Sequence, residues 1–190
     1  MSNNFIESQE FLKIDFLKTP LKKGIYDQCR FVNCNFENVH ASNIEFVECE
    51  FTDCNFSNAI VKDTAFKDVR FENCKMLGVK FSDCNPFLLK VYFKECTMSF
   101  ASFFRLKMSH TKFIKCNLTS VDFVETQLTN ATFEQCDLKS AIFESSNLQK
   151  ADFSSSYNFS ISPDKNVLKG AIFSKENVVG LLDGFGIVVY

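Results

Sequence analysis

The sequence has no tryptophan and contains only six glycines, three prolines and two histidines among its 190 residues. It also lacks the glycine-rich nucleotide-binding patterns GxGxxG and GxxxxGK[ST], the nucleophile motif GxSxG and the zinc motif HExxH. His40 and His110 are far apart, and neither belongs to a Cys/His zinc spacing. We therefore expect a protein that is not an enzyme and that uses no cofactor and no metal.

Long apolar runs and an excess of charge are absent as well. No stretch approaches the ~18 apolar residues of a membrane span, and residues 1–10 lack the basic region and apolar core of a signal peptide. The formal net charge is only −2, so no global attraction to nucleic acid is indicated. These absences predict a cytoplasmic chain without membrane or nucleic-acid partners, whose nine cysteines are reduced thiols.

Phenylalanine is abundant instead, with 24 copies, and it recurs with a period of five. We call the large central residue of each five-residue unit i. It is Phe31, Phe36, Phe46, Phe51, Phe56, Val61, Phe66, Phe71, Met76 and Phe81. A small or β-branched residue stands at i−2, and the flanking positions are mostly polar; the i−2 residues are Cys29, Cys34, Cys49, Cys54, Ala59, Thr64, Val69, Cys74 and Val79.

A period of five cannot be accommodated by a straight strand. Residues i and i−2 share a face of an extended chain, but an odd repeat moves the apolar face to the other side at every unit. The chain keeps both residues inside only by turning after each unit. Short sides joined by regular turns form a coil, and stacked coils form a solenoid.

Two columns of residues fix the number of sides per coil at four. Aromatic residues recur at a spacing of 20 with one step of 22, as Phe31, Phe51, Phe71, Phe93, Phe113, Phe133 and Phe153. Cysteines keep the same spacing with the same irregular step, as Cys34, Cys54, Cys74, Cys96, Cys116 and Cys136. The sequence therefore predicts an all-β solenoid with four five-residue sides per coil and a two-residue insertion in residues 85–92.

The cysteine column has two interpretations. Six aligned thiols resemble a metal store, but zinc requires ligands that converge tetrahedrally, whereas thiols one strand apart point in parallel. Disulfides are disfavoured by the Cβ separation of about 4.8 Å between adjacent strands. We expect the cysteines to pack as small apolar side chains.

The ends of the repeat are less regular. Residues 1–190 are expected to form one domain with repeats at about 14–153, starting irregularly with Phe16, Leu21 and Tyr26. A loop is expected at 154–166, one last side at 168–173, and a short helix from Lys175 to about Asp183, capped by Ser174. The apolar C-terminus either caps the coil or forms a symmetric dimer; the candidate dimer residues are Leu181, Leu182, Phe185, Ile187, Val188, Val189 and Tyr190.

Charge varies along the chain. Residues 26–89 hold ten acids and six bases, residues 90–115 hold one acid and six bases, and residues 116–160 hold six acids and two bases. The last acidic band is either a solvated face or a surface for a partner with a basic groove; its acids are Asp122, Glu125, Glu134, Asp137, Glu144 and Asp152. Pro86 and Phe87 in the insertion either repack over the coil or contact a partner.

The A/C-x-F/L-x-x repeat over residues 14–153 resembles the pentapeptide-repeat family. This resemblance implies that the all-β solenoid is a right-handed quadrilateral β-helix. The segment ADFSSSYNFSISPDKNVLKGAIF, followed by LLDGFGIVVY, resembles the end of its Qnr-type quinolone-resistance and microcin-immunity branch. That resemblance implies a homodimer joined at the C-terminus that imitates B-DNA and engages DNA gyrase or topoisomerase IV. A scaffold for a partner other than a topoisomerase is the alternative.

Overall fold

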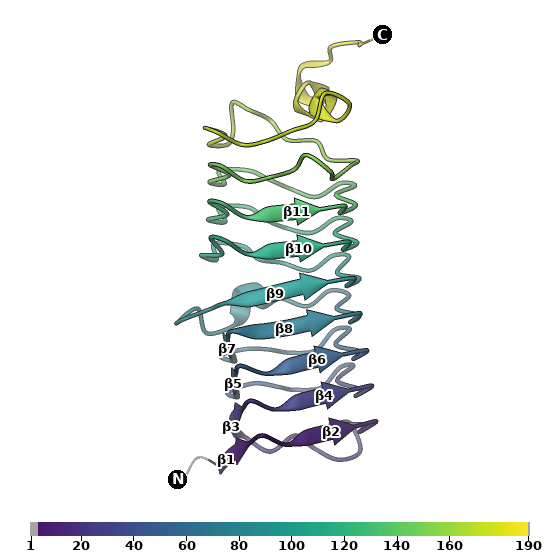
Figure 1. Ribbon diagram of the computed structural model, residues 1–190, viewed down its shortest axis with the longest axis vertical. Coiled ribbons are helices and arrows are strands. Elements are labelled where there is room, and N and C mark those ends of the chain that lie inside the picture. The colour runs from purple at the N-terminus through teal and green to yellow at the C-terminus, as the bar shows by residue number, and fades with distance from the viewer. Residues whose placement is uncertain (1–3, 190) are drawn as a thin grey trace.

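The computed structural model describes residues 4–189 as one rod of stacked coils, with the two termini at opposite ends (Figure 1). Its strands are three or four residues long and lie on two faces of the rod. Face one carries β1 (Asn4–Glu7), β3 (Gly24–Asp27), β5 (Glu45–Val47) and β7 (Ala65–Lys67). Face two carries β2 (Glu10–Leu12), β4 (Arg30–Val32), β6 (Glu50–Thr52), β8 (Val69–Glu72), β9 (Val91–Lys94), β10 (Lys112–Ile114) and β11 (Thr132–Glu134).

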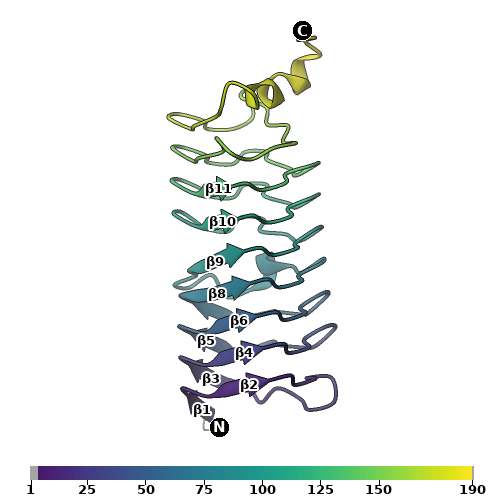
Figure 2. The same ribbon diagram turned by 45° about the vertical axis from the view of Figure 1, so that its right-hand side comes forward.

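All pairings between these strands are parallel, and their register confirms four sides per coil. Phe31 pairs with Phe51, and Phe51 pairs with Phe71, each at a separation of 20. The step from Phe71 to Phe93 is 22, so the two extra residues lie where the sequence places them. Isolated bridges continue the ladder on face three, for example Asn35 with Asn55, and on face four, for example His40 with Ile60. The quadrilateral β-helix is therefore confirmed (Figure 2).

The interior is a continuous column of phenylalanine rings. Successive rings on face two are stacked with centroids 4.6–5.3 Å apart between Phe31 and Phe153. The column extends beyond the sequence prediction at both ends, because Phe11 stacks on Phe31 at 4.6 Å and Phe173 stacks on Phe153 at 5.4 Å. Rings of the neighbouring faces meet this column edge-on, as Phe103 meets Phe113 at 5.9 Å. Offset and edge-to-face contacts of this kind stabilise aromatic cores.

Each corner turns through one residue with a left-handed backbone. Asn33, Asn58 and Asp63 have φ values of 53°, 55° and 56°, a region that asparagine and aspartate tolerate better than most residues. Glycine takes the same place at Gly78, with φ of 67°. This repeated conformation directs the chain into the next side and keeps positions i and i−2 inside.

The cysteines pack in the interior, as predicted, and all nine are free and buried. Seven of these thiols also donate to the carbonyl of residue i in the preceding coil, as Cys54 does to Phe31 at 3.3 Å and Cys136 does to Phe113 at 3.3 Å. Ser156 occupies an equivalent position, and its hydroxyl donates to the carbonyl of Phe133 at 2.6 Å. The i−2 position therefore takes a small side chain, and a cysteine or serine there also donates a hydrogen bond, whereas Ala59 and Val79 only fill the space.

Burial of these thiols predicts a loss of stability at alkaline pH. Burial raises the pKa of Cys49 and of Cys84 to about 12, whereas an unfolded thiol titrates near 8.5. The native state therefore retains protons that the unfolded state releases, so stability is complete below pH ~8.5 and falls as pH rises toward 12. We expect each thiol to contribute a loss of about 2 kcal/mol in the free energy of unfolding by pH 10.

Urea unfolding at pH 7.5 and pH 10 under reducing conditions measures this slope. A Cys49→Ala/Cys84→Ala variant is the control, because it lacks these two thiols and keeps the rest of the chain. The variant is expected to lose distinctly less stability than the parent between the two pH values. Equal losses would show that these thiols do not contribute.

The C-terminal end is closed by 3₁₀ turns, which corrects the predicted helix from Lys175 to Asp183. The turns are η2 (Val178–Leu181) and η3 (Asp183–Phe185), and a further 3₁₀ turn, η1 (Phe81–Asp83), lies in the middle of the rod. Ser174 does cap the segment, since its hydroxyl accepts the N–H of Asn177 at 3.2 Å. An α-helix is disfavoured in this segment because residues 178–186 contain two β-branched valines, Val178 and Val179, and three glycines. Within residues 4–189, no helix has the length and apolar character needed to cross a membrane.

Candidate interaction surface

The six acids of residues 116–160 are distributed around the rod. Asp122, Glu125 and Glu144 belong to face four and its corner, because Asp122 bridges Ser102 and Ile142 there. Glu134 and Asp152 belong to face two, where Asp152 bridges Thr132 and Ile172, and Asp137 belongs to face three, where it bridges Asn117 and Tyr157. The structure therefore does not bring the six carboxylates together on one face.

Most of these carboxylates also have partners within the chain. Glu125 forms a two-point ion pair with Arg105, at 2.7 and 3.1 Å, and Glu144 pairs with Lys165 at 3.0 Å. Asp122, Asp137 and Asp152 each accept the N–H two residues ahead, at 2.9–3.1 Å. Asn55 and Asn117 do the same in other coils, so these three aspartates fill a structural slot of the repeat. Within residues 4–189, only Glu134 of the six has neither an ion pair nor a side-chain hydrogen bond.

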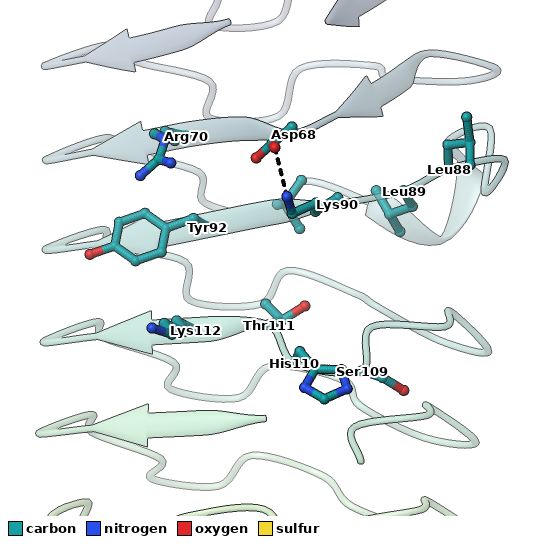
Figure 3. A pocket seen from close by; sticks show the side chains of 11 residues that line it. Asp68, Arg70, Leu88, Leu89, Lys90, Tyr92, Ser109, His110, Thr111 and Lys112 are labelled. Atoms are coloured by element: carbon teal, nitrogen blue, oxygen red, sulfur yellow. Dashed lines mark hydrogen bonds and ion pairs between the residues drawn. The ribbon is translucent and has the colours of Figure 1, made fainter. Parts of the chain in front are cut away.

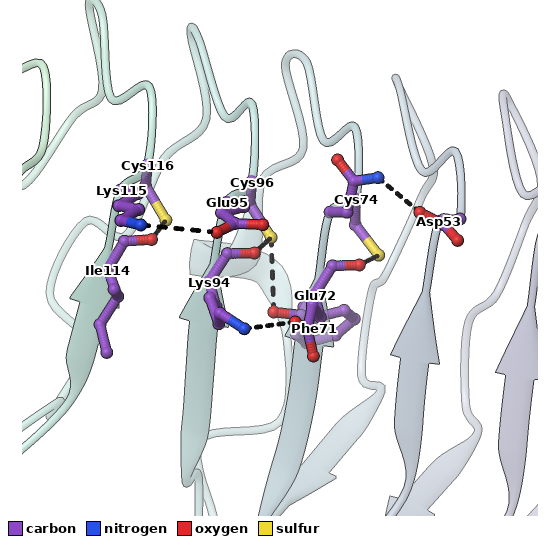
Figure 4. Close-up of polar contacts among 11 residues, drawn as sticks. Asp53, Phe71, Glu72, Cys74, Lys94, Glu95, Cys96, Ile114, Lys115 and Cys116 are labelled. Atoms are coloured by element: carbon purple, nitrogen blue, oxygen red, sulfur yellow. Dashed lines mark hydrogen bonds and ion pairs between the residues drawn. The ribbon is translucent and has the colours of Figure 1, made fainter.

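Ion pairs between adjacent coils explain the banded charge. The in-register stack places residues 20 or 22 apart side by side, so Arg30 meets Glu50 at 3.5 Å. Lys94 meets Glu72 at 2.5 Å in the same way (Figure 4). Lys115 likewise approaches Glu95 at 4.0 Å. The basic band is thus largely neutralised by the acidic bands beside it. In the sequence these pairs are opposite charges 20 or 22 residues apart. The net charge of a segment does not reveal them.

The insertion projects from the corner between faces one and two. Phe87 and Leu88 are 66% and 63% exposed, and Pro86 is exposed as well. The Asn85 side chain accepts the N–H of Phe87 at 3.0 Å, and the ammonium group of Lys67 lies 5.7 Å from the centre of the Phe87 ring. Pro86 and Phe87 are therefore presented to solvent instead of packing into the core.

Asn177 closes the C-terminal end of the coil. Its side-chain amide donates to the carbonyl of Phe153 at 2.8 Å and to that of Ser156 at 2.9 Å. The Phe153 carbonyl is the one that a cysteine or serine of a further coil would otherwise engage. Gly180 lies so close to Phe159 that a side chain there would collide with its carbonyl oxygen. The cap, which contains Asn177 and Gly180, therefore packs closely against the end of the last coil.

The residues after the cap extend beyond the last coil, along the axis of the rod (Figure 1). Leu181 packs against the core and Leu182 is half-buried. Phe185, Ile187 and Val189 are 54–55% exposed, and Val188 is 72% exposed. Tyr190, the last of the candidate dimer residues, lies outside the described residues. The exposed side chains form an apolar tail at one end of the molecule, which we call the C-terminal tail (residues 185–189).

A metal ion or a small molecule would need a ligand site of another kind. Within residues 4–189, no group of three or more His, Cys, Asp or Glu side chains could hold a metal ion. A hollow of about 640 Å³ is an open groove on the outside of the rod, beside the insertion. A filled interior and an exposed, variable exterior define the class of protein: a parallel β-solenoid whose available surface is its outside.

The comparisons with known proteins place this solenoid in a family. The family model described as "Pentapeptide repeat region" matches residues 25–103 and 87–157, and the chain therefore belongs to the pentapeptide-repeat family. No curated protein matches at a significant level.

Among solved structures, a trypsin-treated form of QnrB1, described as a plasmid-mediated fluoroquinolone resistance protein, gives a TM-score of 0.73. The identity is 14%, over 98% of this chain and 92% of that chain. A second trypsin-treated form gives 0.62 at 13% identity, covering 99% and 98% of the two chains. Full-length QnrB1 gives 0.55 at 17% identity, covering 97% and 100%. At these identities the match establishes the shared fold.

Proposed function

We propose that this chain is a non-enzymatic, cytoplasmic protein that acts by binding another protein along the outside of its rod. The observation that supports this most is the filled interior. Phenylalanine rings stack without interruption from Phe11 to Phe173, so side chains fill the interior of the rod along this column, where a substrate would otherwise be enclosed. The exposed insertion, the charged faces and the C-terminal tail are the features left for recognition.

DNA gyrase or topoisomerase IV is the partner we propose, bound by a homodimer joined through the C-terminal tail. The whole-length similarity in fold to QnrB1, a fluoroquinolone resistance protein, supports this choice. A stiff rod that carries carboxylates can enter a cationic groove made for duplex DNA, which is itself a rod of regularly spaced negative charge. The proposed contacts are Glu134 and the neighbouring acids of residues 116–160, together with Pro86 and Phe87.

A supercoiling assay with purified DNA gyrase tests this proposal. Titration of the protein is expected to inhibit supercoiling and, at lower concentration, to reduce the DNA cleavage caused by ciprofloxacin. Glu134→Lys should raise the concentration required about fivefold, because it reverses one charge at the interface. Glu7→Lys, which changes the net charge equally at the opposite end, should leave it unchanged. No effect on gyrase or topoisomerase IV at low salt would remove this partner.

A scaffold for a different protein is the second candidate, and the coil-to-coil ion pairs favour it. They engage six of the sixteen carboxylates in the two acidic bands, whereas a mimic of DNA requires its carboxylates to be free. Affinity capture on the immobilised protein distinguishes the two candidates. Recovery of a partner other than a topoisomerase, together with an inactive supercoiling assay, would support the scaffold.

A further inference from the structure

The two-residue insertion opens a groove on the outside of the rod. On face one the ladder joins Ala65 to Asn85 and starts again from Lys107 to Gln127, and no bridge joins Asn85 to Lys107 in the part of the chain that the structure describes. On face two the ladder continues through β8, β9 and β10 without a break. The chain between Pro86 and Lys90 is displaced outward at this corner. A groove of about 640 Å³ lies beside it (Figure 3).

One wall of the groove is a row of three side chains on successive strands. Tyr92 on β9 is in register with Arg70 on β8 and with Lys112 on β10. The guanidinium carbon of Arg70 lies 5.8 Å from the centre of the Tyr92 ring, a cation–π contact that leaves its N–H groups available. The three side chains therefore present positive charge, an aromatic ring and positive charge along the axis of the rod.

Arg70 and Lys112 lack an acidic partner in the part of the chain that the structure describes. Glu50, the neighbour of Arg70 in the ladder, is paired with Arg30 at 3.5 Å. Asp68, the one acid that lines the groove, is paired with Lys90 at 2.6 Å. Within residues 4–189, neither Arg70 nor Lys112 has a carboxylate within 4.0 Å, although most cations of residues 90–115 do. The groove thus retains positive charge on a protein whose net charge is −2.

The opposite end of the groove is apolar. Leu88, which is 63% exposed, and the half-buried Leu89 line it there (Figure 3). Leu88 also has a φ of 57°, a left-handed conformation that is unfavourable for leucine and is held by the bond from Leu89 N–H to the Pro86 carbonyl at 3.3 Å. A ligand of this groove must combine negative charge with an apolar group.

We propose that this groove binds an extended acidic peptide segment of a partner protein, with two carboxylates three residues apart and an apolar side chain between them. Arg70 and Lys112 are two strand spacings apart, which is about 10 Å. A polyproline-type chain rises about 3.1 Å per residue and returns to the same side every third residue, so carboxylates at i and i+3 are spaced by about 9 Å. Tyr92 provides the aromatic surface on which such chains dock. Single-stranded nucleic acid requires a longer basic track and several stacking rings.

Fluorescence anisotropy with a labelled peptide of three Glu-Pro-Leu triplets tests the proposal. A peptide of the same composition with its glutamates in one block is the first control, and an oligothymidylate is the second. We expect the triplet peptide to bind saturably and at least tenfold more tightly than either control. Binding should weaken as salt is raised, because the contacts are ionic.

Two variants with equal change in charge locate the site. Arg70→Glu/Lys112→Glu should weaken binding of the triplet peptide more than tenfold. Lys62→Glu/Lys75→Glu, at exposed lysines on faces four and three, should change it less than twofold. An unchanged far-ultraviolet spectrum and melting temperature confirm that both variants fold.

Three results would overturn the proposal: no saturable binding of the triplet peptide, equal weakening by the two variants, or tighter binding of the oligothymidylate. The last would assign the groove to nucleic acid. The inference goes beyond the proposed topoisomerase partner, because the groove and the acids of residues 116–160 are separate surfaces. Failure of the supercoiling assay leaves the peptide result intact, and the reverse also holds.

Discussion

Replacing Phe93 by alanine is expected to lower the free energy of unfolding by about 3–5 kcal/mol. The Phe93 ring is fully buried. It stacks on Phe71 and on Phe113, at 5.3 Å in each case, and it meets Phe81 and Phe103 edge-on at 5.8 and 5.9 Å. Its removal leaves a cavity in the middle of the rod that the adjacent coils cannot fill without breaking their ladder. A loss of this size is a large part of the stability of an ordinary domain.

Urea unfolding followed by circular dichroism measures the loss, and Phe100→Ala is the matched control. Phe100 is 69% exposed at a corner, with φ of 62°, so the same chemical change there should alter stability by about 0.5 kcal/mol or less. Coils contact only their neighbours, so the Phe93 variant can also unfold in two steps, one for each half of the rod. Similar losses in the free energy of unfolding for both variants would contradict the view that the stacked phenylalanine rings stabilise the rod.

Changing Ile187 and Val188 to serine is expected to convert a dimer to a monomer. These side chains are 55% and 72% exposed at the end of the rod, beyond the cap formed by Asn177. If a symmetric partner covers the C-terminal tail, two polar substitutions at the centre of that contact remove most of its apolar burial. Light scattering should then give a mass near 21.8 kDa for the variant and twice that value for the parent.

The control for this experiment uses apolar residues on the sides of the same coils. Ile142 and Val167 are each 47% exposed on faces four and one. Ile142→Ser/Val167→Ser should remain dimeric, because those faces point away from the end of the rod. A monomeric parent protein would exclude the dimer, and a monomeric control variant would place the interface on the sides instead.

The coil was predictable because its residues obey one rule at every turn. Phe51 and Cys54 recur 20 positions away with the same role, and the step of 22 at Phe93 and Cys96 marks the insertion in two independent columns. The cap did not follow such a rule. Ser174 suggested a helix, but Asn177 uses its side chain to bind the Phe153 carbonyl, and Gly180 is required by its contact with Phe159. Tertiary contacts of this kind leave no periodic signal in the sequence.

The interaction surface was less predictable than the fold, because a charge in the sequence does not show which charge it meets. Asp122 and Asp152 looked like free acids, but they hold the backbone of their own turns. Arg105 looked like part of a basic band, but it neutralises Glu125. Arg70 and Lys112 lack a carboxylate partner within residues 4–189 because the nearby acids Glu50 and Asp68 pair with other cations, and only the structure shows this. Reading charges at the spacing of the coil would have identified most of these pairs in advance.

Our central proposal is that the outside of the rod, and not its interior, binds DNA gyrase. The most direct measurement is the binding of purified DNA gyrase to the immobilised protein at low salt, for the parent, a surface variant and an interior variant. We predict saturable binding that Glu134→Lys weakens about fivefold and that the interior variant Cys54→Ala leaves unchanged. Absence of binding, or equal weakening by the interior and surface variants, would contradict the account.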